Sequence, residues 1–237
     1  MSVRVLPVVV VVALAVLGSV GRSANGATPP LPNAADFSSR VDNPWFPLLP
    51  GSVYLYRGVK DGQPARDVLT VTHDTATIDG ARCVVVRDRL YLAGHLEERT
   101  TEWYGQDKQG DVWYFGENTA ELAKDGHVTT TEGTWRAGVD GARPGIFMFA
   151  RPTAGQAGRQ EFYKGHAEDR FTVLRLGAAV RVPYVATHKA LLTEESTPLE
   201  PGVLDHKFYV RGIGTVLEQT VKGGDERAAL VSFKPGR

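Results

Sequence analysis

Glycine turns recur at nearly even spacing through the first half of the chain, and the segments between them are rich in β-branched and aromatic side chains. The turns lie 14 to 18 residues apart, at Asp61-Gly62, Asp79-Gly80, Ala93-Gly94, Gln109-Gly110 and Asp125-Gly126. Asp-Gly pairs readily adopt the positive φ angles that tight β-hairpins require. The spacing therefore predicts a meander of antiparallel hairpins.

The periodicity between the turns predicts the fold class. No stretch there keeps apolar residues at three- and four-residue spacing for long enough to form an amphipathic helix. Strand-like segments resume at Arg159 and continue to Phe233, so we count about a dozen strands in all. A sheet of this size tends to curl, because its twist accumulates and its open edges are hazardous. We predict an all-β fold: a large curved antiparallel meander, half-barrel or open barrel, with few short helices.

One irregular segment, residues 138–158, interrupts the predicted series of hairpins and contains seven glycines and prolines. It contains the apolar group Ile146-Phe147-Met148-Phe149. A long irregular segment in a compact domain is often a binding loop or lid. The alternative is a crossover loop that a buried hydrophobic plug holds in place. We name Phe147 and Phe149 as candidate ligand contacts.

The N-terminal residues predict export from the cytoplasm. Arg4 precedes a run without ionisable side chains, and small polar residues follow, as in a cleaved signal peptide. The alternative is a retained membrane anchor. We predict a signal peptide over 1–27, a proline-rich lead-in arm over 28–50 and one β-rich domain over 51–237. The mature protein is expected to be secreted or extracytoplasmic, with no integral membrane domain.

The single cysteine and the charge balance limit how the protein can be anchored and what it can bind. Cys83 lies far from the N-terminus, so it cannot serve as an N-terminal lipoprotein anchor, and it has no disulfide partner within the chain. Its neighbours Val84 to Val86 favour a small buried side chain over a nucleophile. The mature chain would carry 25 basic and 27 acidic side chains. That balance excludes the basic face that nucleic-acid binding needs.

No specific catalytic motif occurs in the chain. Nucleophile elbows, phosphate loops, His-Glu-x-x-His and paired-cysteine zinc spacings are missing from the sequence. Asp107 and Asp111 flank Gly110 as in a calcium loop, but further carboxylates are lacking and turn formation explains the pair. We expect neither a metal ion nor a cofactor.

The segment Trp103 to Glu117 concentrates aromatic rings beside a carboxylate. Strict alternation along a strand would place Trp113, Phe115 and Glu117 on one face. Glu117 would then lie at the rim of an apolar cavity, with a raised pKa suited to acid–base work, or point to water at a strand end. Trp113 and Phe115 are the corresponding candidate ligand contacts.

A second candidate segment runs from Gln160 to Asp169. In an extended chain His166 and Glu168 face the same way, as a metal site or an imidazole–carboxylate pair would require. The alternative is a surface pair that binds nothing. Glu161 and Asp169 add carboxyl groups nearby. If a catalytic or metal site exists, we predict that it joins Glu117 to Glu168 or His166 at the cavity mouth.

Several motifs together resemble those of a family of uncharacterised exported bacterial proteins, common in actinobacteria. The motifs are Asp42-Asn-Pro-Trp-Phe-Pro-Leu-Leu-Pro-Gly51, Asp107 to Glu117, Glu132 to Ala142, Pro144-Gly-Ile146 and Gln160 to Asp169. They cover nearly the whole mature chain, and the resemblance carries no catalytic residue with it. The closing segment Lys207 to Val216 also resembles envelope proteins of the lipoprotein-carrier type, which implies a half-barrel around an apolar cavity.

Three function classes remain open. We favour a soluble exported protein that holds a small apolar, amphipathic or lipid-like ligand in the cavity of its curved sheet. An envelope interaction or structural protein would instead expose aromatic rings as a patch. An extracytoplasmic enzyme would use the carboxylate–histidine site described above.

Overall fold

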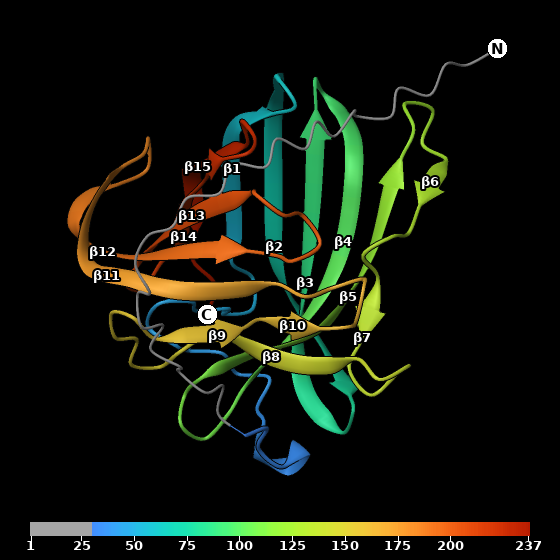
Figure 1. The fold of residues 1–237 in the computed structure, drawn as a ribbon, viewed down its shortest axis with the longest axis vertical. Helices are drawn as coiled ribbons and strands as arrows, with labels where there is room; N and C mark the ends of the chain where they lie inside the picture. Colours follow the sequence, from blue (N-terminus) through green and yellow to red (C-terminus); the bar gives the residue numbers. More distant parts are fainter. Residues whose placement is uncertain (1–29) are drawn as a thin grey trace, which may run out of the picture.

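The computed structural model describes residues 30–237, and in this part the protein is a single 15-stranded antiparallel sheet that curls on itself (Figure 1). The predicted all-β class is confirmed. The one helical element in the described part is the short 3₁₀ turn η1, Ala34–Asp36. The predicted signal peptide over 1–27 lies outside the described residues.

The strands have the following bounds. The first eight are β1 Val53–Lys60, β2 Gln63–Ile78, β3 Ala81–Leu92, β4 His95–Gln106, β5 Val112–Leu122, β6 Val128–Thr130, β7 Trp135–Arg136 and β8 Arg143–Met148. The others are β9 Ala157–Arg159, β10 Glu161–Phe162, β11 Arg170–Arg181, β12 Ala186–Ser196, β13 Leu204–Val210, β14 Gly214–Lys222 and β15 Arg227–Lys234.

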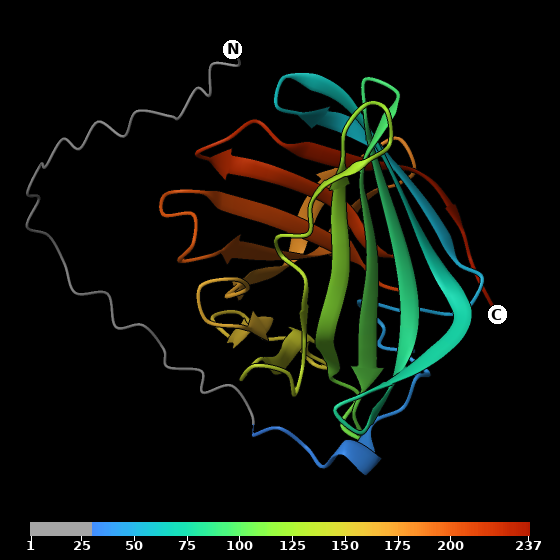
Figure 2. The same cartoon turned by 90° about the vertical axis from the view of Figure 1, so that its right-hand side faces the viewer.

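The strand order makes the sheet an almost closed barrel. Along the sheet the strands follow the order β10-β8-β5-β4-β3-β2-β1-β15-β14-β13-β12-β11-β9. The two end strands, β9 and β10, are separated in sequence by Gln160 alone, so the chain itself bridges the open seam. Figure 2 shows β2 to β5 facing β13 to β15 across the interior.

The predicted hairpin turns form where the glycines are. Asp61-Gly62, Asp79-Gly80 and Ala93-Gly94 connect β1 to β4, and both residues of each pair have positive φ. Such turns match the right-handed twist of the strands they join. Regular hairpin turns thus set the register of the first four strands.

The segment 138–158 is less irregular than the sequence suggested. It contains β8, which pairs with the end strand β10, and most of the other end strand, β9. The expectation of a loop missed β8 because Gly145 and Pro144 read as turn residues. At this position glycine has a different role. An added Cβ on Gly145 would lie 2.2 Å from the Arg159 carbonyl oxygen, so only glycine lets β8 approach the bridging chain.

The lead-in arm closes one end of the barrel. Asn43 is buried, and its side-chain oxygen accepts hydrogen bonds from the backbone N–H groups of Trp45 (2.9 Å) and Phe46 (3.2 Å). Its side-chain nitrogen donates to the Gly110 carbonyl at 2.8 Å. These bonds hold Trp45 and Phe46 against the strands, and both rings belong to the same hydrophobic core as the sheet.

Candidate functional site

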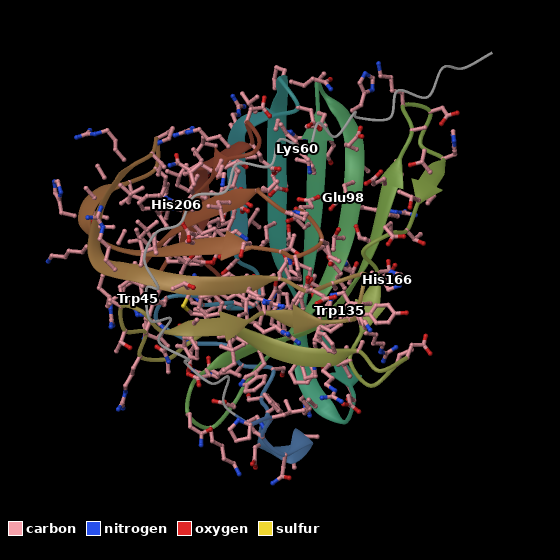
Figure 3. The ribbon with its side chains drawn as sticks, in the orientation of Figure 1. Trp45, Lys60, Glu98, Trp135, His166 and His206 are labelled. Atoms are coloured by element: carbon pink, nitrogen blue, oxygen red, sulfur yellow. The ribbon has the colours of Figure 1, made fainter. Side chains whose placement is uncertain are left out.

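The curled sheet encloses a cavity of about 240 Å³ above the arm. A second space of about 180 Å³ adjoins it, and the two share lining residues such as Tyr56, Asp67 and Glu218. The second space reaches Lys60 and Glu98, which lie close together toward the end of the barrel away from the arm (Figure 3). The two spaces therefore adjoin along these shared side chains.

Four rings form an aromatic floor at the arm end of the cavity, one from the arm and three from the sheet. They are Phe46, Tyr104, Tyr114 and Phe147. Phe46 lies 4.5 Å from Phe147 and 5.5 Å from Tyr104 between ring centroids, and Tyr104 stacks on Tyr114 at 4.7 Å. Edge-to-face and offset stacked pairs at these distances are favourable. The floor is a preformed apolar surface.

Carboxyl groups dominate the remaining wall of the cavity. Seven line it: Asp67, Asp88, Glu102, Glu117, Glu161, Asp169 and Glu218. They come from six strands and one loop, and they project inward because alternate residues of a strand point to the same face. A ligand in this space therefore meets an aromatic floor and an acidic wall.

Lys207 is the one cationic side chain among the residues that line this cavity. Its ammonium lies 2.9 Å from Glu195 Oε2 and 3.2 Å from Glu218 Oε1. Burial alone would lower the pKa of Lys207, but Glu195 and Glu218 hold it well above its ordinary value. Glu195 also accepts hydrogen bonds from Tyr209, Thr193 and Gln160. The lysine is thus already neutralised by its own partners.

Three carboxyl oxygens in the wall lack a hydrogen-bond partner although water cannot reach them: Asp67 Oδ1, Asp88 Oδ1 and Glu102 Oε2. The other oxygen of Glu102 accepts a hydrogen bond from the Tyr104 hydroxyl at 2.8 Å. A buried polar atom without a partner is costly, and such atoms are uncommon in folded proteins. All three side chains line the cavity, so part of the acidic wall has no hydrogen-bond partner within the described protein.

Burial raises the pKa of six of the wall carboxyls, namely Asp67, Glu102, Glu117, Glu161, Asp169 and Glu218. Burial, followed by the charge of Asp169, raises the pKa of Glu161 to about 8. Burial and the adjacent Asp88 raise the pKa of Asp67 far above its usual range. Burial raises the pKa of Glu218 to about 7, against the opposing effect of Lys207. An empty cavity near neutral pH therefore keeps part of its acidic wall protonated.

Glu117 lines the cavity, but Trp113 and Phe115 do not share its face. Across the β4–β5 pair Trp103 lies opposite Gly116, and Tyr104 lies opposite Tyr114. Phe115 is therefore an extra residue, a β-bulge that reverses the alternation. Trp113 and Phe115 pack on Phe37 outside the cavity, at 6.0 and 4.9 Å between centroids. The expected single face of Trp113, Phe115 and Glu117 is wrong because of this bulge.

The second candidate segment, Gln160 to Asp169, has some of its candidate side chains in the cavity and others outside it. Glu161 and Asp169 line the cavity, whereas His166 and Glu168 do not. His166 Nδ1 lies 3.3 Å from Glu132 Oε1, and its side chain is 46% exposed at the periphery of the molecule (Figure 3). Glu168 accepts a hydrogen bond from the Gly165 backbone. The geometry gives no support to a joint site of Glu117 with either residue.

The remaining candidates are also separated by the fold. Phe147 is part of the aromatic floor, while Phe149 packs on Phe171 at 5.4 Å between centroids. Cys83 is fully buried, as expected. Asp107 accepts hydrogen bonds from the backbone of Gln109 and Asp111 and from the Trp113 indole, which confirms its role in the turn.

Sequence reasoning missed Asp67, Asp88, Glu102, Lys207 and Glu218. A signal for one strand was available, because Glu98, Thr100, Glu102 and Tyr104 alternate along β4. That pattern identifies a shared face. It does not say whether the face turns inward, because polar residues at alternate positions more often face solvent.

No three carboxyl, imidazole or thiol groups in the described part of the chain are arranged to hold a metal ion. Residues 30–237 also contain no helix that could cross a lipid bilayer.

Comparisons with known proteins give few matches. No family model matches the sequence, and no match is found among curated proteins. One solved structure, of a predicted lipoprotein from Parabacteroides distasonis, is similar at 10% sequence identity. The match covers 80% of this chain and 97% of the other, with a TM-score of 0.41.

Proposed function

We propose that this protein is an exported binding protein that holds one small amphipathic molecule in the cavity of its curled sheet. The observation that carries the proposal is a cavity that combines an aromatic floor with a carboxyl wall. Binding sites for small molecules are concave, with apolar surface and a few convergent polar groups. An entirely apolar ligand would leave the wall carboxyls without partners, so an amphipathic ligand fits better.

The cavity is a better candidate than an outer surface. Among the exposed large apolar side chains of the described residues, Leu174 and Leu176 share β11, and the others lie on different strands or in loops, for example Val59 on β1, Val128 on β6 and Val221 on β14. A docking patch would need such side chains to be contiguous.

The test uses two phenylalanines of one strand region as a matched pair. The Phe147→Ala variant removes a ring from the aromatic floor, whereas Phe149→Ala removes a ring that packs on Phe171 outside it. Native mass spectrometry of the mature chain, and a thermal-shift screen of amphipathic compounds, identify a ligand. We expect Phe147→Ala to weaken binding of that ligand by about tenfold or more, since a buried ring contributes about 1.5 kcal/mol or more.

Phe149→Ala is expected to lower stability while the folded fraction binds normally. The proposal fails if no compound is retained or shifts the unfolding temperature. It also fails if the ligand found binds equally to wild type and to Phe147→Ala.

A further inference from the structure

The lining of the cavity carries more carboxyl groups than cations. Seven carboxyls line the first space with Lys207 as its single ammonium, and the adjoining second space adds the cations Arg57, Lys60 and Arg227 beside Glu98 and Glu226. The Lys207 ammonium already contacts Glu195 and Glu218. The carboxyls of Asp67, Asp88 and Glu102, on the neighbouring strands β2, β3 and β4, have no cation of their own among the described hydrogen bonds and ion pairs.

The unpartnered oxygens of these three residues are an independent observation. Asp67 Oδ1, Asp88 Oδ1 and Glu102 Oε2 are shielded from water and accept no hydrogen bond. All three side chains line the cavity. Burial, followed by Asp88 and Glu102, raises the pKa of Asp67, and burial, followed by Asp88, raises the pKa of Glu102. A cation with several N–H donors, in the part of the cavity that these three side chains line, would offset their charge and supply hydrogen-bond donors to the wall.

The aromatic floor begins beside Glu102. The Tyr104 hydroxyl donates to Glu102 Oε1, and the Tyr104 ring stacks on Tyr114 and lies 5.2 Å from Phe147. Cations bind favourably over the faces of such rings. A bare metal ion fits poorly, because no three ligand groups in residues 30–237 converge tightly enough. An organic cation with an apolar portion spans the distance from the wall to the floor.

We propose that the cavity is selective for a protonated amphipathic amine. Its nitrogen occupies the space beside Glu102 and the Asp67–Asp88 pair, and its apolar portion lies on the rings of Tyr104, Tyr114 and Phe147. This inference rests on the proposed function and adds the chemical class of the ligand.

The test compares three probes of nearly equal shape: the 2-phenylethylammonium ion, the neutral 2-phenylethanol and the phenylacetate anion. We expect isothermal titration calorimetry to show the ammonium binding about tenfold or more tightly than the alcohol, with the anion weakest. Glu102→Gln should bring the ammonium close to the alcohol. Glu121→Gln is the matched control, because Glu121 is exposed on the neighbouring strand β5 and does not line the cavity.

A second readout is independent of variant folding. The titratable groups around Glu102 include Asp67, Asp88, Glu98, Glu117, Lys207 and the Tyr104 hydroxyl. A bound cation displaces protons from the carboxyls, so titrations of wild type in buffers of different ionisation enthalpy should show proton release for the ammonium and none for the alcohol. Affinity for the ammonium should rise between about pH 5 and about pH 8.

Equal affinity of ammonium and alcohol, or binding of the ammonium without proton release, overturns the amine inference. If the neutral probe or another amphipathic compound still binds and its binding requires Phe147, the proposed function stands and only the amine inference falls. If no probe binds, the amine inference falls, and native mass spectrometry of the unmodified protein decides the proposed function separately.

Discussion

Glu161 is a buried carboxyl group whose pKa the fold raises strongly. It is 7% exposed, lies one residue past the seam, and is affected by the charges of Asp169 and Lys207. Glu117 is in turn affected by Glu161. Burial, with Asp169, raises the folded pKa of Glu161 to about 8 from a reference value of 4.5. The folded chain thus binds this proton more tightly than the unfolded chain does.

The stability of the protein should therefore depend on pH in a defined direction. The contribution of Glu161 is complete below about pH 4.5 and is lost as the pH rises through about 8. The neutral variant Glu161→Gln should lose less unfolding free energy between about pH 5 and about pH 9 than wild type does. The expected difference is at least about 1.4 kcal/mol, the value of a tenfold change in proton affinity. Urea unfolding at a series of pH values measures it.

The exposed Glu121→Gln variant serves as the control and should follow the wild-type curve. Parallel curves for Glu161→Gln and wild type would show that Glu161 is not protonated in the fold.

At the scale of elements, the barrel depends on the contact between β8 and the chain that bridges the seam. β8 pairs with β5 on one side and β10 on the other. An added Cβ on Gly145 would lie 2.2 Å from the Arg159 carbonyl oxygen and 2.5 Å from the Gln160 carbonyl carbon. Both obstructing atoms belong to the backbone, so they cannot move aside as a flexible side chain would.

Gly145→Ala is therefore expected to destabilise the protein by about 2 kcal/mol or more, in the range of overpacked interiors. The comparison is Gly94→Ala in the β3–β4 turn, where no atom lies within 4 Å of the added Cβ and the cost is that of a positive φ alone. Denaturant unfolding of both variants measures the difference. A Gly145→Ala variant as stable as Gly94→Ala would contradict the close contact at the seam.

At the scale of the whole molecule, the sheet has a first half, β1 to β5, and a second half, β11 to β15, which are connected at three places. β15 pairs with β1 and with β14, so it joins the first hairpins to the last. The chain between β9 and β10 closes the other side. Phe46 of the arm lies 5.5 Å from Tyr104 of β4 and 6.4 Å from Tyr209 of β13 between ring centroids. Neither half has an interior of its own.

Unfolding is accordingly expected to be one cooperative transition. Far-UV circular dichroism and tryptophan fluorescence should give coincident denaturation curves, and the slowest-exchanging amides of β3 and of β12 should share one opening free energy. Two separate transitions would show that the halves are independent units and that the interior is not a single enclosed space.

The sequence alone determined the all-β class and the hairpins of the first strands, because these signals are local. Positive φ at Asp61-Gly62 and the turns that follow it, together with alternating β-branched segments, specify hairpins without any distant contact. The number of strands then requires curling. Tertiary structure decided which side chains face the interior. The bulge at Phe115 reverses one face of β5, and the arm supplies Phe46 from outside the sheet. The sheet also turns Asp67, Asp88 and Glu102 inward, although a polar residue in an alternating strand normally faces water.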